Sequence, residues 1–195
     1  MMKIGLLDGG DGRSKHSPKV GFQVVRWAKP QVVWAKLNID GSARSSPGPS
    51  GGAGICRNLG GDLIFAFSMG FGVGSSNRAE LHSVWQCLSM RRSPGLSKVV
   101  VESDSSFVVD LVNRTAIPSW AWDHWRKRID EITISGSFSF SHIPREVNGP
   151  TDGLARLASA TQGNSAYFVW ADLPRDIKGL VLLDKTRLGA VKEIP

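Results

Sequence analysis

Hydrophobic residues recur along the chain from about residue 32 with two different periods. Period-two alternation between clusters of turn residues predicts the three strands of an antiparallel meander. These strands run over 33–40, 53–58 and 63–71. Glycine and proline residues at 47–52 and 59–62 predict the connecting turns. Residues 79–90 repeat apolar side chains at helical spacing after a polar cap at 75–77, so a helix is expected to follow the meander.

The second half of the chain alternates between strand and helix patterns. Residues 98–104 include three consecutive valines, which are typical of a strand buried on both faces. A helix capped by Ser105 or Ser106 is expected next. The remaining elements are a helix at 118–132, a strand at 138–143 and a last helix that opens at 148–152. This order predicts an α/β fold whose sheet is partly parallel.

The patterns divide the chain into three parts. Residues 1–31 are rich in Gly, Ser, Lys and Arg, which predicts a flexible basic N-terminal tail. Residues 32–161 contain the periodic segments and are expected to form one domain. Residues 162–195 predict a linker and a short C-terminal segment that docks on the domain or forms a weak helix.

The net charge of the chain indicates an anionic partner. Lys and Arg number 24 against 17 Asp and Glu, so the formal net charge is +7. This excess favours nucleic acid as the partner, and a basic surface kept for solubility is the alternative. Because no apolar run is long enough to span a bilayer and no secretory signal is recognisable, we expect an intracellular protein, nuclear or cytoplasmic, without a membrane partner. Cys56 and Cys87 lie in apolar runs and are expected to be buried free thiols.

Four acids stand at junctions between predicted elements, where they can converge. Asp40 ends the first strand before a glycine turn, and Asp104 ends the central strand. Glu80 and Asp152 fall in the first turns of two predicted helices. Each acid also has an ordinary reading as a turn residue, a helix-dipole partner or an N-cap. Because α/β sheets place ligands at the carboxyl ends of strands, we favour a shared site.

The predicted third helix combines aromatic and basic residues. Trp120, Trp122 and Trp125 are expected to be core anchors. The basic triplet at 126–128 is either a solvated face or a phosphate contact, and the overall charge favours the phosphate contact.

Six segments of the chain, taken in order, resemble a known family. They are NIDGS at 38–42, GAGICRNLGG at 52–61, NRAEL at 77–81, VESDS at 101–105, HIPREVN at 142–148 and DGLARLA at 152–158. From Val33 to Ala160 the chain resembles a ribonuclease H domain. It is most similar to the plant ribonuclease H-like domains that are related to non-LTR retrotransposon reverse transcriptases.

The resemblance implies a fold, a reaction and a metal site. The implied fold has a mixed five-stranded sheet, three antiparallel strands followed by parallel ones, flanked by helices. Asp40, Glu80, Asp104 and Asp152 are implied ligands of two Mg²⁺ ions, for which Mn²⁺ can substitute, because hard cations prefer oxygen ligands. Asp40 is expected to bridge the two ions. The implied activity is endonucleolytic hydrolysis of the RNA strand of RNA–DNA hybrids by a monomer.

The resemblance also implies substrate contacts, and the chain departs from the family at a few positions. The implied contacts are Gly41, Ser42, Asn77, Arg78 and Ser105, with a helix cap as the alternative role of Asn77. His142 matches a histidine that assists product release in bacterial-type members, and a structural role at the strand end is the alternative. The departures are a Pro-rich turn at 47–50, Thr151, and Gly153, which is expected to weaken the last helix.

Two other functions remain open at this point. A catalytically silent, retroelement-derived nucleic-acid-binding module would keep the fold and the basic charge without the reaction. An exonuclease of the same superfold would use the same acids on a different substrate.

Overall fold

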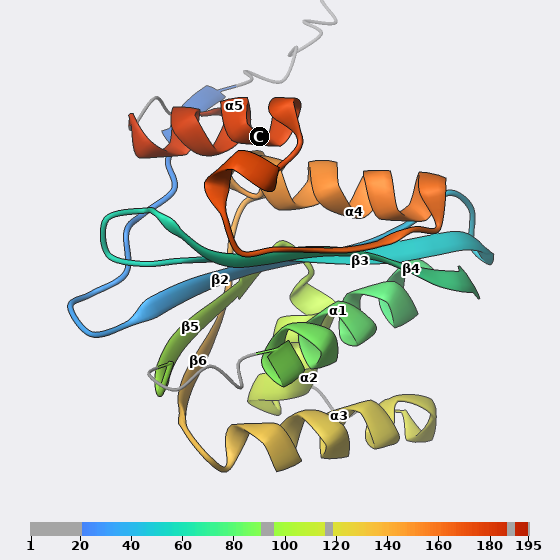
Figure 1. The fold of residues 1–195 in the computed structure, drawn as a ribbon. Coiled ribbons are helices and arrows are strands. Elements are labelled where there is room, and N and C mark those ends of the chain that lie inside the picture. Colours follow the sequence, from blue (N-terminus) through green and yellow to red (C-terminus); the bar gives the residue numbers. More distant parts are fainter. Residues whose placement is uncertain (1–20, 91–95, 116–118, 187–189, 195) are drawn as a thin grey trace, which may run out of the picture.

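The computed structural model describes residues 21–90, 96–115, 119–186 and 190–194, and a mixed six-stranded sheet lies at its centre (Figure 1). The sheet strands are β2 (Ala35–Ala43), β3 (Gly48–Arg57), β4 (Leu63–Gly74), β5 (Lys98–Ser103), β6 (Ser137–His142) and β7 (Asn164–Tyr167). Their order across the sheet is β6-β5-β2-β3-β4-β7. β2 and β6 each pair with β5 in parallel, and the pairs β2–β3, β3–β4 and β4–β7 are antiparallel. The predicted mixed α/β class is confirmed, with six strands in place of five.

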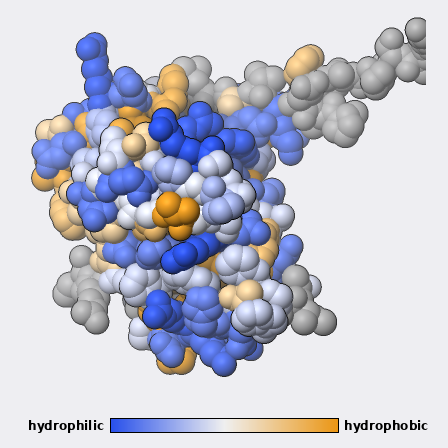
Figure 2. Space-filling view, turned by 90° about the vertical axis from the view of Figure 1, so that its right-hand side faces the viewer, coloured by the Kyte–Doolittle hydropathy of each residue, from blue (hydrophilic) through white to orange (hydrophobic). Residues whose placement is uncertain are grey.

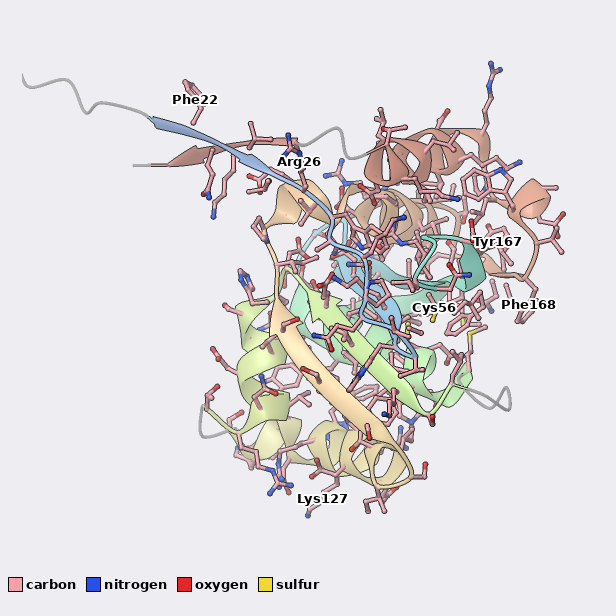
Figure 3. The ribbon with its side chains drawn as sticks, turned by 90° about the vertical axis from the view of Figure 1, so that its left-hand side faces the viewer. Phe22, Arg26, Cys56, Lys127, Tyr167 and Phe168 are labelled. Carbon is pink, nitrogen blue, oxygen red and sulfur yellow. The ribbon has the colours of Figure 1, made fainter. Side chains whose placement is uncertain are left out.

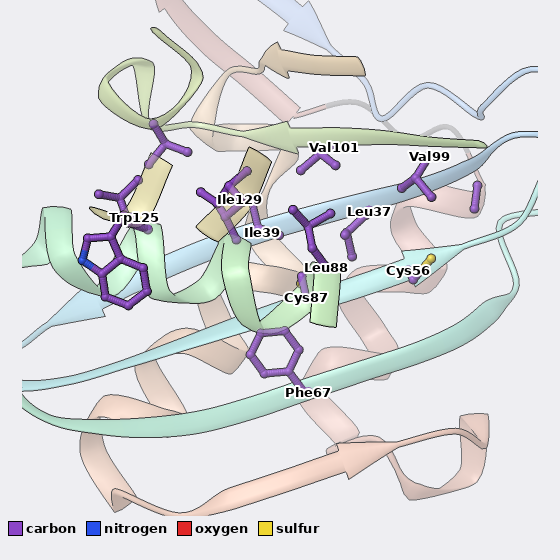
Figure 4. Packing of buried hydrophobic residues seen from close by; sticks show 14 of the residues in the cluster. Leu37, Ile39, Cys56, Phe67, Cys87, Leu88, Val99, Val101, Trp125 and Ile129 are labelled. Carbon is purple, nitrogen blue, oxygen red and sulfur yellow. The ribbon is translucent and has the colours of Figure 1, made fainter. Parts of the chain in front are cut away.

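Helices cover both faces of this sheet (Figure 1). They are α1 (Ser76–Met90), α2 (Ser106–Asn113), α3 (Trp120–Thr133), α4 (Gly149–Thr161) and α5 (Arg175–Lys185), with short 3-10 turns η1 (Arg145–Val147) and η2 (Trp170–Asp172). α1, α2 and α3 share one core with Leu37 and Ile39 of β2 (Figure 4), whereas α4 and α5 pack on the opposite face (Figure 1). Because side chains alternate along a strand, Asn38 and Asp40 point toward the α4–α5 face.

The Gly-rich segment that was predicted as a turn at 47–52 is largely strand. β3 begins at Gly48, so only the residues before it form the turn. A Cβ at Gly51 would lie 2.6 Å from the backbone nitrogen of Ser159 on α4, and one at Gly52 would overlap the Ser83 hydroxyl of α1. The glycines therefore let helices on both faces approach the same strand closely, which is a reason for glycine inside a strand.

The C-terminal region is more structured than expected. β7 adds a polar edge strand beside β4, which the sequence pattern did not reveal. α5 docks on α4, where Ile177 Cδ1 would lie 2.7 Å from a Cβ at Gly153. Gly153 therefore has a packing role, since the lack of a side chain there lets α5 approach.

The N-terminal segment from residue 21 lies against the domain, although it was predicted as part of a tail. β1 (Gly21–Val25) pairs antiparallel with β8 (Ala190–Ile194), which brings the first and last described strands together. Figure 3 shows β1 and β8 side by side, with Phe22 labelled on β1 and Arg26 just after it. Trp27 follows and is buried. The predicted tail at 1–20 lies outside the described residues.

The two cysteines and the lengths of the helices were also subjects of prediction. Cys56 and Cys87 are buried free thiols in the core between the sheet and α1, as predicted, and burial raises the pKa of Cys56 to about 12 (Figure 4). In the part of the chain that the structure describes, no helix combines the length and the apolar character that crossing a membrane requires.

Candidate metal centre

Three of the four predicted acids meet at one point. Asp40 on β2, Glu80 on α1 and Asp104 just after β5 each place a carboxylate oxygen within 4.8 Å of the other two. Asp40 and Glu80 are buried, and Asp104 is half-buried. Within the described ranges, no other group of His, Cys, Asp and Glu residues gathers in this way. The predicted convergence of these three acids is therefore present in the fold.

Two details of the local structure differ from the prediction. β2 continues through Gly41 and Ser42 to Ala43, so Asp40 lies inside the strand and no glycine turn follows it. α1 begins at Ser76, which places Glu80 in the second helical turn. A Cβ at Gly41 would overlap the backbone nitrogen of Glu80. Glycine after Asp40 is therefore what allows α1 to carry Glu80 up to the strand.

Asp104 is free for the cluster because its neighbour caps the helix. The Ser105 hydroxyl accepts a hydrogen bond from the Val108 backbone N–H at 3.4 Å, so Ser105 is the N-cap of α2. The alternative in which Asp104 is merely the N-cap is therefore wrong. An acid next to a capped helix start also benefits from the positive end of the helix dipole.

Burial and neighbouring carboxylates disfavour the ionisation of Asp40 and Glu80. Burial, followed by the charges of Asp104 and Asp152, raises the pKa of Asp40 to about 8. Burial, followed by the charges of Asp40 and Asp104, raises the pKa of Glu80 well above its ordinary value. Both effects have the expected sign, because desolvation and like charges each favour the neutral acid.

A divalent cation fits this group of residues. The Glu80 Oε2 atom is buried and has no hydrogen-bond partner among the described residues. Three carboxylates in one place offer the hard oxygen ligands that Mg²⁺, Mn²⁺ or Ca²⁺ require. A bound cation would satisfy the unpaired oxygen and offset the mutual repulsion of the acids. The chemistry of the donors therefore matches a metal centre.

Asp152 does not join the three other acids. It lies in the first turn of α4, as predicted, but its carboxylate pairs with Arg156 at 3.0 Å and with Arg145 at 3.4 Å. It remains close enough for its charge to raise the pKa of Asp40. The structure thus places Asp152 beside the cluster with its oxygens occupied by two arginines.

Asn148 is a site residue that the sequence pattern did not single out. Its side-chain N–H2 group donates to the Ile39 carbonyl at 2.9 Å and to Asp104 Oδ1 at 3.0 Å. It is fully buried at the start of α4. Asn148 therefore joins β2 to the carboxylate that follows β5. Its only signal in the sequence was its place four residues before Asp152, at the opening of the last helix.

The other predicted site residues surround the cluster. His142 is exposed at the end of β6, and its Nε2 atom lies 3.2 Å from the Asp104 carbonyl oxygen. Ser42 is half-buried two residues beyond Asp40. Asn77 and Arg78 are exposed in the first turn of α1, where the Ser75 hydroxyl accepts from the Arg78 backbone N–H at 3.4 Å. The helix cap is therefore Ser75 and not Asn77.

The basic triplet of α3 is occupied by contacts within the protein. Arg126 and Lys127 pair with Asp123 at 2.7 and 2.9 Å, and the Arg128 guanidinium lies 5.6 Å from the ring centroid of Trp85. These contacts do not favour the phosphate contact that the charge had suggested. Figure 3 places Lys127 at the opposite end of the molecule from Phe22 and Arg26.

The tryptophans of α3 differ from one another in burial. Trp125 is in the core and Trp122 packs against it, whereas Trp120 is 91% exposed. The expectation of a core anchor therefore holds for Trp125, holds in part for Trp122 and is wrong for Trp120.

Comparison with known proteins agrees with this fold. A mixed sheet with helices on both faces and an acid cluster spanning β2, α1 and the end of β5 is a ribonuclease H-like architecture. A solved ribonuclease H1 that was isolated from compost, crystallised with an RNA/DNA hybrid, superposes with a TM-score of 0.61 at 23% sequence identity. The match covers 65% of this chain and 96% of that one.

Sequence relatives place the chain in a family. The model of the reverse transcriptase-like family matches residues 38–158. The ribonuclease H of Nitratidesulfovibrio vulgaris is 33% identical over 141 residues, which cover 64% of this chain and 88% of that protein. A protein of Arabidopsis thaliana, named as a candidate ribonuclease H, is 29% identical over 172 residues and covers 87% of this chain. The chain spans 27% of that plant protein's length.

The chain belongs to the reverse transcriptase-like family of ribonuclease H-like domains. The resemblance predicted from the six sequence segments is therefore confirmed.

Proposed function

We propose that this chain is a metal-dependent endonuclease that hydrolyses the RNA strand of RNA–DNA hybrids. The observation that carries the proposal is the convergence of Asp40, Glu80 and Asp104, with a buried oxygen of Glu80 left without a protein partner. Relatives named ribonuclease H, and a similar fold solved with an RNA/DNA hybrid, support this choice of substrate. Because all three clustered acids come from one chain, the site does not require a second copy, and we expect a monomer.

In this proposal the acids would hold Mg²⁺, as two ions, for which Mn²⁺ can substitute. Bound Mg²⁺ supplies an activated water and charge neutralisation at the scissile phosphate. Asp40 would be the central ligand, because its carboxylate interacts electrostatically with those of Glu80, Asp104 and Asp152. Asp152 would be the fourth ligand, in place of its ion pairs with Arg145 and Arg156.

Residues around the acids are proposed to contact the hybrid. Ser42, Asn77, Arg78 and Ser105, with the backbone of Gly41, offer small polar groups and one cation near the cluster. Such groups suit a shallow minor groove that displays 2′-hydroxyls, which distinguish RNA from DNA. Arg78 is exposed and is the one cation of the five, so it can form an ion pair with a phosphate.

His142 keeps two roles in the proposal. Its exposed ring is accessible to a leaving product. Its contact with the Asp104 carbonyl oxygen would instead anchor the loop that follows β5. His142→Ala distinguishes them, since a product-release role lowers the turnover rate while a purely anchoring role lowers stability.

The test is Mg²⁺-dependent cleavage of an end-labelled RNA–DNA hybrid, run beside single-stranded RNA and duplex DNA. Wild type is expected to cut only the RNA strand of the hybrid, at internal positions. Asp104→Asn, which keeps the side-chain shape, is expected to abolish cleavage and to leave hybrid binding in place. Asp172→Asn changes an exposed acid outside the cluster and is the matched control. Retained cleavage by Asp104→Asn would contradict the proposal, and a ladder that shortens from one end would indicate an exonuclease.

One observation favours a second candidate, a catalytically silent nucleic-acid-binding module. Asp152 is held by Arg145 and Arg156 instead of facing the other three acids. A domain that keeps those ion pairs when it binds a hybrid would lack its fourth ligand. Hybrid binding without any Mg²⁺-dependent cleavage by the wild type would identify this function.

A further inference from the structure

A buried network of charged and polar side chains lies behind the acid cluster. It connects the N-terminal segment, three sheet strands and the C-terminal helix α5. We call this set the clasp network. Its members are Trp27, Lys36, Asn38, Arg57, Glu102 and Asp184.

Asn38 of β2 is the centre of the clasp network. Its side-chain oxygen accepts from Trp27 Nε1 at 2.9 Å and from Arg57 Nη2 at 2.8 Å. Its side-chain N–H2 group donates to Glu102 Oε2 at 3.0 Å. Asn38 is fully buried, so each of these hydrogen bonds is shielded from water. The orientation of the Asn38 amide is thus determined by three partners from three different segments.

Charged contacts complete the network at its edges. Arg57 Nη1 donates to Asp184 Oδ2 of α5 at 2.7 Å, and the Arg57 guanidinium lies 3.7 Å from the ring centroid of Trp27. The Lys36 ammonium pairs with the other oxygen of Glu102. Apart from Asp184, whose side chain is 14% exposed, the charged members are almost completely buried.

The clasp network stands directly behind two of the clustered acids. Asn38 and Glu102 are paired residues in the parallel register of β2 and β5. Asp40 comes two residues after Asn38 on β2, and Asp104 comes two residues after Glu102, just past the end of β5. Because strand side chains alternate, Asn38 and Asp40 share a face of β2. The Asn38–Glu102 hydrogen bond therefore links β2 to β5 two residues before Asp40 and Asp104.

We propose that Trp27 and Asp184 are positioning residues that hold Asp40 and Asp104 in place for metal through Asn38, Arg57 and Glu102. Both lie outside residues 38–158, where the family model matches. The inference deepens the proposed function, because it concerns the same metal centre. It gives Trp27 and Asp184 a role in the site although neither is one of the clustered acids.

Stability alone does not account for this composition. Several buried charges are costly to desolvate, and well-packed apolar residues of similar size often stabilise a core at least as well. Hydrogen bonds with fixed directions add what apolar contacts lack, namely one preferred alignment of β2 with β5. Supporting residues behind metal ligands commonly alter metal affinity when they are changed.

The experiment measures Mg²⁺ binding by calorimetry and hybrid cleavage on the same full chains. Trp27→Phe removes the Nε1–H donor to Asn38 and keeps an aromatic ring beside Arg57. Asp184→Asn is the second variant, because it removes the charge that holds Arg57. Asp62→Asn is the matched control, since Asp62 also pairs with α5, through Lys185 at 2.6 Å, but on the surface.

We expect Trp27→Phe and Asp184→Asn to weaken Mg²⁺ binding roughly 3- to 10-fold, somewhat less than changes in direct partners of metal ligands. Their kcat at low Mg²⁺ should fall with KM for the hybrid unchanged, and high Mg²⁺ should restore kcat. Asp62→Asn should match wild type. All binding is measured well below each variant's unfolding temperature, where a purely structural defect leaves the Mg²⁺ affinity unchanged.

The outcomes separate the positioning role of Trp27 and Asp184 from the proposed nuclease activity. Unchanged Mg²⁺ affinity in the folded variants would overturn the positioning role, whatever happens to their melting temperature. If one variant does not fold, the other decides the question. If wild type binds Mg²⁺ but cleaves no hybrid, weaker Mg²⁺ binding by the variants still supports the positioning role while the proposed activity fails. A wild type that binds no Mg²⁺ overturns both.

Discussion

Replacing Asp40 by Asn is expected to stabilise the metal-free protein at alkaline pH. Asp40 is buried beside Asp104 and Glu80, and its pKa rises from 3.8 to about 8. The folded state therefore holds a proton that the unfolded state has lost between these two pH values. Stability must consequently fall as pH rises from about 4 to about 8, because the folded state binds more protons in this range.

The raised pKa of Asp40 sets an upper limit on the effect of this substitution. Each pKa unit corresponds to about 1.4 kcal/mol, so the full rise corresponds to at most about 6 kcal/mol of unfolding free energy at pH 8. Part of this rise comes from the charges of Asp104 and Asp152 and not from burial alone. Between pH 5 and pH 8 we expect wild type to lose roughly 2 to 4 kcal/mol relative to Asp40→Asn.

Urea denaturation in the presence of a chelator provides the measurement. Wild type, Asp40→Asn and the control Asp172→Asn are unfolded at pH 5, 6.5 and 8. The Asp40→Asn curve should lie above wild type at pH 8 and converge with it toward pH 4, whereas the control should follow wild type. Added Mg²⁺ should stabilise wild type most at pH 8, because metal binds the ionised carboxylates. Parallel pH profiles for wild type and Asp40→Asn would refute the reasoning.

Three further substitutions test other parts of the structure. Gly41→Ala should lower the unfolding free energy measured in urea by about 1–3 kcal/mol, because its Cβ would overlap the backbone of α1. Gly149→Ala is the control and should cost far less, since a Cβ there meets nothing within 4 Å. Arg156→Gln should lower the Mg²⁺ concentration for half-maximal cleavage, since it frees Asp152; a higher requirement would contradict the fourth-ligand role. Gly179→Ala should raise the unfolding free energy by about 0.5–1 kcal/mol, because α5 gains a better helix former in open space; a loss of stability would show that the glycine is needed.

Much of the candidate site was predictable from local sequence. Glu80 follows a polar cap in an amphipathic helix, and Asp104 directly follows a valine-rich strand, so their elements were recognised from periodicity. The convergence itself was an inference from fold topology, because carboxyl ends of adjacent strands meet at one edge. The structure confirms it for Asp40, Glu80 and Asp104.

The rest depended on contacts that no local pattern contains. Arg156 stands four residues after Asp152, a spacing that signals an ion pair, but Arg145 comes from a separate turn. β7 is short and polar, and only its pairing with β4 makes it a strand. The role of Trp27 depends on Asn38, Arg57 and the distant α5. The composition of residues 1–31 is typical of a flexible tail and gave no sign that Trp27 is buried and donates a hydrogen bond to Asn38.

The cleavage assay on a labelled RNA–DNA hybrid tests the central claim most directly. With Mg²⁺, wild type should cut the RNA strand at internal positions, and a chelator should stop it. Asp104→Asn should bind the hybrid with little change and leave it intact. A hybrid that stays uncut by wild type across a full range of Mg²⁺ and Mn²⁺ concentrations would contradict the assignment of a nuclease.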